Sequence, residues 1–190
     1  LNEMTKGFKH GDLIIIAARP GMGKTTICLN LMNHVLMRGG GVVFFSLEMP
    51  AEQIMLRMLS AKTSISLQNI MTAKMDDEEW SRLSDACEDM SNRKLFVYDS
   101  GYVNIHQIRT QMRKLKSSHP EITLCVIDYI GLMMATSNFS DRHLQIAEIS
   151  RGLKLLAREL NMPIIALSQL NRSLESRANK RPMLSDLRES

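Results

Sequence analysis

Residues 13–25 read LIIIAARPGMGKT, an apolar run that leads directly into a glycine-rich loop. The last eight residues, ARPGMGKT from Ala18 to Thr25, match the P-loop pattern with alanine in place of the first glycine. In this pattern Gly21 and Gly23 let backbone N–H groups turn toward phosphate oxygens, and the following helix points its positive end at them. Because the loop lies between a predicted strand and a predicted helix, a chance glycine-rich turn is the weaker interpretation. The loop predicts nucleoside triphosphate binding.

The P-loop pattern also assigns chemistry to two side chains. Lys24 is expected to reach the β- and γ-phosphates, and the Thr25 hydroxyl is expected to hold Mg²⁺. The predicted cofactors are therefore ATP and Mg²⁺. The residues predicted to bind the nucleotide are Ala18, Arg19, Pro20, Gly21, Met22, Gly23, Lys24, Thr25 and Thr26.

Apolar runs alternate with segments of helical period along the rest of the chain. The predicted strands are residues 13–17, 42–46, 95–99, 123–128 and 163–168. The predicted helices carry apolar stripes such as Cys28, Leu31, Met32 and Val35, or Trp80, Leu83, Cys87 and Met90. Asp76 with Glu79 indicates a helix start, and Pro50 suits a first helical position. This alternation predicts an α/β fold: a mainly parallel sheet with helices on both faces.

Composition narrows the class of protein. A chain of 190 residues, 44% hydrophobic and 23% charged, is typical of one soluble globular domain, here residues 1–190. No apolar run approaches the roughly 18 residues of a membrane span, so no membrane association is expected. The cysteines Cys28, Cys87 and Cys125 lie in apolar patterns and are predicted to be reduced core residues of a cytoplasmic protein. The net charge of +4 does not by itself indicate nucleic acid binding.

Polar residues follow the predicted strands where each strand ends. Glu48, Asp99, Asp128 and Gln169 all take such positions, and the P-loop follows the first strand. In open parallel sheets ligands bind beyond the carboxyl ends of the strands, so these side chains are expected to share a site.

Asp128 ends the run LCVID, which has the form of a Walker B strand whose carboxylate orders Mg²⁺ through water. The alternative, an acidic turn residue at a strand end, is disfavoured by the P-loop upstream. The next residue is Tyr129, and a tyrosine hydroxyl, whose ordinary pKa is about 10, cannot act as a general base at neutral pH. The hydrolytic base must therefore be sought elsewhere.

Glu48, in VVFFSLEMP (residues 42–50), is the candidate for that base. From the end of its strand it would polarise a water molecule in line with the γ-phosphate. The alternative is that Glu48 only stabilises the start of the helix near Pro50, an effect of about 0.3–1 kcal/mol.

Residues 170–189 are long, polar and basic, and they contain no aromatic side chain. They predict phosphate contacts without base stacking, and hence sequence-independent, salt-dependent binding to single-stranded DNA. The predicted contacts are Arg172, Arg177, Lys180, Arg181 and Arg188. The alternative is a solvated loop. A second basic stripe, Arg151, Lys154 and Arg158, is interpreted as a solvated or subunit-facing surface.

The stretches DLIIIAARPGMGKT, FFSLEM, VIDYIGLM, ALSQLNRSLESR and RPMLSDLRES together resemble the DnaB-type replicative DNA helicases, ring-forming motors with a RecA-like core. The resemblance covers nearly the whole chain. It departs at Gly21, where serine is frequent, and at Gly131, where a larger polar residue is frequent. The second departure weakens the match of the loop after Asp128 to a DNA contact.

The resemblance implies roles for matching residues. Lys24 and Thr25 would bind nucleotide and Mg²⁺, Glu48 would be the base, Asp128 the Walker B acid and Gln169 a γ-phosphate sensor. Arg188 and Glu189 would lie in the segment that approaches the DNA backbone.

The resemblance also implies partners. These are single-stranded DNA, a homo-hexamer, primase and a helicase loader at a bacterial or phage replication fork. The arginine finger and the primase-binding N-terminal domain of such helicases are expected outside these 190 residues. A recombinase, or a DNA-binding ATP switch with little hydrolysis, remains the alternative.

Overall fold

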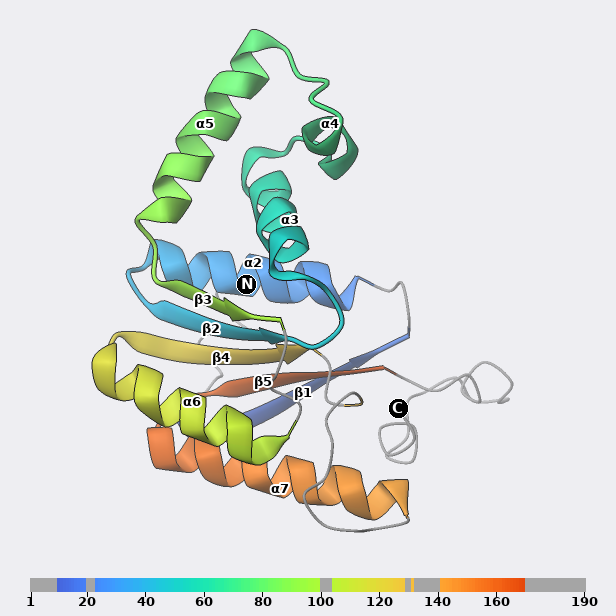
Figure 1. Ribbon diagram of the computed structural model, residues 1–190, viewed down its shortest axis with the longest axis vertical. Coiled ribbons are helices and arrows are strands. Elements are labelled where there is room, and N and C mark those ends of the chain that lie inside the picture. The colour runs from blue at the N-terminus through green and yellow to red at the C-terminus, as the bar shows by residue number, and fades with distance from the viewer. Residues whose placement is uncertain (1–9, 20–22, 100–103, 129–130, 132–140, 170–190) are drawn as a thin grey trace.

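The computed structural model describes residues 10–19, 23–99, 104–128, 131 and 141–169, and within them five strands form one parallel sheet (Figure 1). The strands are β1 (Leu13–Ala18), β2 (Gly41–Ser46), β3 (Leu95–Tyr98), β4 (Ile122–Asp128) and β5 (Ile164–Gln169). Their order across the sheet is β1-β5-β4-β2-β3, and every pair of neighbours is parallel. The predicted parallel sheet is confirmed.

Helices cover both faces of this sheet (Figure 1). On one face lie α2 (Lys24–Met37) and the start of α3 (Ala51–Thr63); on the other lie α6 (Ile105–Ser118) and α7 (Arg142–Leu160). The short α4 (Leu67–Met71) and α5 (Asp77–Ser91) rise with α3 away from the sheet. None of the helices in the described residues combines the length and apolar character that crossing a bilayer demands.

Strand β2 shows why the sheet forms. All six of its residues are buried, and successive side chains point to opposite faces. Val43 and Phe45 pack with the core under α6 and α7, while Val42 and Phe44 pack with the core under α2. A strand buried on both faces reads as a continuous apolar run, which is why it was predictable from sequence.

The helix starts differ in a way that matters for the site. The predicted start of α5 is confirmed, because Asp76 and Glu79 form a reciprocal capping box. Helix α2 has neither a side-chain cap nor an acidic residue in its first turn. Its first N–H groups are therefore available to a ligand. Pro50 is the N-cap of α3 rather than its first helical residue, so that expectation was wrong by one position.

Two residues expected in the core are exposed. Cys28 and Cys125 are buried as predicted, and burial raises the pKa of the Cys28 thiol to about 12. Cys87 and Trp80, by contrast, lie on the exposed side of α5, with Trp80 46% exposed. The periodicity of α5 was read correctly, but the helix stands off the sheet, and only Ala86 and Met90 are buried.

Candidate nucleotide-binding site

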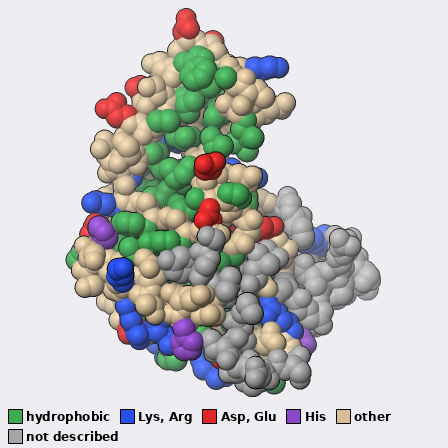
Figure 2. All heavy atoms as spheres, in the orientation of Figure 1, with side chains coloured by type: hydrophobic (Ala, Val, Ile, Leu, Met, Phe, Trp, Pro, Cys, Tyr) green, Lys and Arg blue, Asp and Glu red, His purple; other side chains and the backbone are tan. Residues whose placement is uncertain are grey.

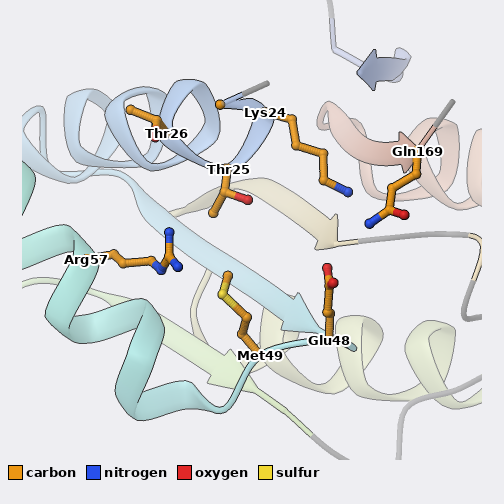
Figure 3. A pocket seen from close by; sticks show the side chains of 8 residues that line it. Lys24, Thr25, Thr26, Glu48, Met49, Arg57 and Gln169 are labelled. Atoms are coloured by element: carbon orange, nitrogen blue, oxygen red, sulfur yellow. The ribbon is translucent and has the colours of Figure 1, made fainter. Parts of the chain in front are cut away.

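A cavity of about 410 Å³ opens at the carboxyl end of the sheet, beside the start of α2. This volume falls within the range of about 300–1,000 Å³ that is usual for small-molecule sites. Its lining residues come from α2, from the turn after β2, from α3 and from the end of β5 (Figure 3). They are Gly23, Lys24, Thr25, Thr26, Glu48, Met49, Arg57 and Gln169.

The start of α2 forms one wall of this cavity. Gly23 is its N-cap, with a left-handed φ of 73° that glycine adopts without strain. The positive end of the helix and its uncapped N–H groups favour an anion in the cavity. The left-handed Gly23 and the uncapped start of α2 are therefore suited to binding a phosphate.

Lys24, in the lining of the cavity, forms an ion pair with Asp128. Lys24 Nζ lies 3.6 Å from Asp128 Oδ1, and both side chains are buried. Burial raises the pKa of the Asp128 carboxyl above its usual range; the Lys24 ammonium opposes this, and the Glu48 charge adds to it. Asp128 is thus a buried acid paired with Lys24.

The donor set suits a magnesium ion. Apart from the ion pair with Lys24, neither oxygen of the buried Asp128 carboxylate has a polar partner among the described residues. The Thr25 side chain lines the same cavity. A carboxylate and a hydroxyl oxygen are the ligands that Mg²⁺ takes alongside water and substrate phosphates.

Glu48 is positioned by the turn that ends β2. The Ser46 hydroxyl donates to the carbonyl of Met49 at 2.5 Å, and the Leu47 N–H donates to the carbonyl of Asp128 at 2.8 Å. These bonds tie the turn to the end of β4. The exposed Glu48 carboxylate points toward the side chains of Lys24 and Gln169 (Figure 3).

Asp99 does not join this cavity. Its Oδ2 accepts a hydrogen bond from the Ala51 N–H at 2.9 Å, which satisfies one of the first N–H groups of α3. Of the polar residues at strand ends, Asp99 is therefore a helix cap on the edge strand rather than a site residue.

The cavity brings together many, but not all, of the predicted site residues. Gly23, Lys24, Thr25, Thr26, Glu48 and Gln169 line it, and Asp128 pairs with Lys24. Ala18 is the last residue of β1 and Arg19 follows it. Of the two, Arg19 is a described residue that does not line the cavity. Pro20, Gly21 and Met22, and the predicted DNA contacts Arg172, Arg177, Lys180, Arg181, Arg188 and Glu189, lie outside the described residues.

Two lining residues were missed from the sequence, Met49 and Arg57. The guanidinium of Arg57 points from α3 toward the start of α2 (Figure 3). Its Nε is buried and has no hydrogen-bond partner among the described residues. An arginine in an amphipathic helix carries no motif of its own. The one available signal was that α3 starts directly after the strand that delivers Glu48.

The parallel sheet, the P-loop sequence and the cavity beside the start of α2 define a RecA-like P-loop ATPase domain. The family model of the DnaB-like helicase C terminal domain matches residues 1–190, and the chain belongs to this family. Nucleotide binding follows from that membership.

Curated relatives and solved structures agree with this family. The chain is 52% identical over 190 residues to a replicative DNA helicase DnaB of Helicobacter pylori, and 47% identical over 192 residues to that of Buchnera aphidicola. All of the chain is matched, but it spans only 39% and 41% of those proteins.

Two solved structures superpose on the whole chain at 38% identity. One is a DnaB-like replicative helicase described with its interactions with primase, at a TM-score of 0.91 over 47% of that chain. The other is the ATPase domain of G40P, at 0.90 over 69%.

Proposed function

We propose that this chain is the motor of a replicative DNA helicase, coupling ATP hydrolysis to movement along single-stranded DNA and to duplex unwinding. The observation that supports this most is the convergence of Lys24, Glu48 and Gln169 on one cavity at the start of α2. These residues come from three separate elements. They are assigned phosphate binding (Lys24), activation of the attacking water (Glu48) and sensing of the γ-phosphate (Gln169).

Binding of the triphosphate is assigned to the start of α2. The N–H groups after Gly23 and the Lys24 ammonium hold the phosphates, with Thr25 and Asp128 toward a magnesium ion. When bound, that ion stabilises the charge that develops on the transferring group. Arg19 and Thr26 remain proposed contacts to the nucleotide.

Glu48 is assigned the role of general base, accepting a proton from the attacking water. The alternative role, a charge at the start of α3, is already filled. The Asp99 carboxylate accepts from the Ala51 N–H, and Glu52 lies in the first turn. Glu48 instead points into the cavity, which favours the catalytic role.

Gln169 is assigned the coupling of nucleotide state to DNA. It is the last residue of β5, it pairs in register with Ala18 at the end of β1, and it lines the cavity. The chain then continues directly into residues 170–189, where the predicted DNA contacts Arg172, Arg177, Lys180, Arg181, Arg188 and Glu189 lie. A side chain that senses the γ-phosphate at this point is one residue from the DNA-binding segment.

Arg57 is assigned a contact to the phosphates or to Glu48 across the cavity. Hydrogen bonds to charged groups are worth about 1.5–3 kcal/mol, so Arg57→Ala is expected to lower ATP affinity or turnover by about 10–150-fold. Arg38→Ala, at the far end of α2, is the matched control and should change neither. Nucleotide titration and steady-state turnover of both variants measure this; unchanged values for Arg57→Ala would remove it from the site.

The partners and the cellular location are also proposed from membership of the family. They are single-stranded DNA, a homo-hexamer, primase and a helicase loader, in the cytoplasm at a bacterial or phage replication fork. The test of the motor function is ATP turnover by the complete protein with and without single-stranded DNA. Stimulated turnover is expected. Nucleotide binding without turnover would instead favour an ATP switch.

A further inference from the structure

Charge is divided unequally between the helices of this chain. Helix α6 carries four cations and no acid, whereas α5 carries six acids and one cation, Arg82. Figure 2 shows Lys and Arg side chains gathered over α6 and α7, on the opposite end of the molecule from α5. The net charge of the chain is only +4, but its positive charge is concentrated on the surface of α6 and α7.

Helices α6 and α7 present this surface as one unit. They pack on the same core, and they approach so closely that a Cβ on Gly152 would lie 2.8 Å from the Ile105 side chain. An ion pair of 2.8 Å between Arg113 and Glu159 joins their outer sides. Cations on the two helices are therefore held on one rigid layer.

Several cations of this layer are already occupied. Lys116 donates to the carbonyls of Pro120 and Ile122, Lys154 pairs with Asp12, and Arg113 pairs with Glu159. Four others have no ion pair within the part of the chain that the structure describes: Arg109, Lys114, Arg151 and Arg158. We call these four residues the basic face.

The geometry of the basic face suits an extended polyanion. Arg151 and Arg158 are seven residues apart on α7, which places them on the same side of the helix, roughly 10 Å apart along its axis. Lys114 and Arg109 add charge from the neighbouring helix. Neither helix carries Phe, Tyr or Trp, and none of the four residues of the basic face is aromatic, so phosphates are the groups that these four cations recognise.

We propose that the basic face binds the phosphate backbone of nucleic acid, as a second contact separate from the one predicted for residues 170–189. The proposal rests on the proposed function, because an unwinding motor generates a displaced strand beside the one it moves along. Binding at this face is sequence-independent and weakens steeply with salt. It revises the interpretation of Arg151 and Arg158 as a solvated or subunit-facing surface.

The alternative partner is another protein surface. Leu155, 55% exposed, lies between Arg151 and Arg158 on the same side of α7, and arginine with an apolar neighbour is common at protein interfaces. The absence of any acid from α6 favours the polyanion, and the experiment separates the two partners.

The experiment replaces Arg109, Lys114, Arg151 and Arg158 together by glutamine in the complete protein. A matched control replaces Arg38, Lys74, Arg82 and Lys94 by glutamine. These four residues belong to neither α6 nor α7, and their replacement lowers the net charge by the same amount. Single-strand affinity is measured over a salt series for both variants and the wild type. ATP turnover without DNA and thermal unfolding are measured alongside, and both should stay close to wild type.

Each phosphate contact contributes about 0.7 to the slope of log affinity against log salt on single strands. The basic-face variant should therefore lose about 2–3 from that slope and bind more weakly, while the control keeps the wild-type slope. Should the four-fold variant unfold, Arg151→Gln with Arg158→Gln alone should lose about 1.4.

Equal slopes for the basic-face variant and the wild type would overturn the inference. Loss of self-association with an unchanged slope would overturn it as well, assigning the face to contact between copies. If the wild type bound no DNA, the proposed function would fail together with it. If the wild type bound DNA and the basic-face variant showed the same salt slope, the inference would fail and the proposed function would still stand.

Discussion

Glu48→Gln is expected to reduce ATP hydrolysis by about 10²–10⁴-fold while leaving ATP binding intact, because a general base contributes about that much to a hydrolytic rate. Glutamine keeps the size and hydrogen-bonding capacity of the side chain but cannot accept the proton. Binding should survive because the start of α2, Lys24 and Asp128 remain in place. Steady-state turnover and nucleotide affinity of the same variant measure this.

The control for this variant is Glu52→Gln. Glu52 is an exposed acid in the first turn of α3, four residues from Glu48 but outside the cavity lining. Either change should cost less than about 1 kcal/mol as a helix-end charge, and Glu52→Gln should leave turnover unchanged. If Glu48→Gln hydrolysed ATP normally with normal affinity, the base would have to be another residue.

Lys24→Met is the second change with a large expected effect. It removes the ammonium assigned to the phosphates, so ATP affinity should fall by about 10–150-fold and turnover should be lost. It also leaves Asp128 buried without its cation, and breaking a buried pair costs about 3–5 kcal/mol of stability. Nucleotide titration and thermal unfolding measure the two effects.

The pH dependence of that instability has a definite sign. Burial already raises the pKa of Asp128, and Lys24 opposes the rise, so the pKa should climb further in Lys24→Met. A folded state that binds more protons than the unfolded state loses stability as pH increases. Lys24→Met should therefore unfold more readily at pH 8 than at pH 5, relative to wild type. Adding Asp128→Asn should remove this difference; its persistence in the double variant would show that Asp128 is not the cause.

The sheet and the nucleotide loop were predictable because both depend on local pattern. Strands such as β2 are buried on both faces, so their apolar runs are unbroken. The residues of the P-loop motif are consecutive in the sequence, so the motif can be recognised without a structure. The strand ends then indicated Glu48 and Gln169, because parallel strands share one carboxyl edge. The direction of each strand is enough to place these two residues at that edge.

The features that the sequence did not predict depend on how the helices pack against one another beyond the sheet. Arg57 reaches the cavity because α3 packs against α2. The apolar periodicity of α3 does not show which helix it packs against. The same rise of α3 and α5 away from the sheet leaves Trp80 and Cys87 exposed. Asp99 looked like a site residue until its bond to Ala51 showed it to be a cap. The predicted DNA contacts at residues 170–189 lie outside the described residues and stay predictions.

The central claim, that this chain drives duplex unwinding, is tested most directly by strand displacement on forks with 5′ or 3′ single-stranded tails. The measurement compares the complete wild-type protein with Lys24→Met, each with and without ATP. ATP-dependent displacement of a forked strand is expected from the wild type and none from Lys24→Met. DNA-stimulated ATP turnover without displacement of either fork would contradict it and would favour a recombinase.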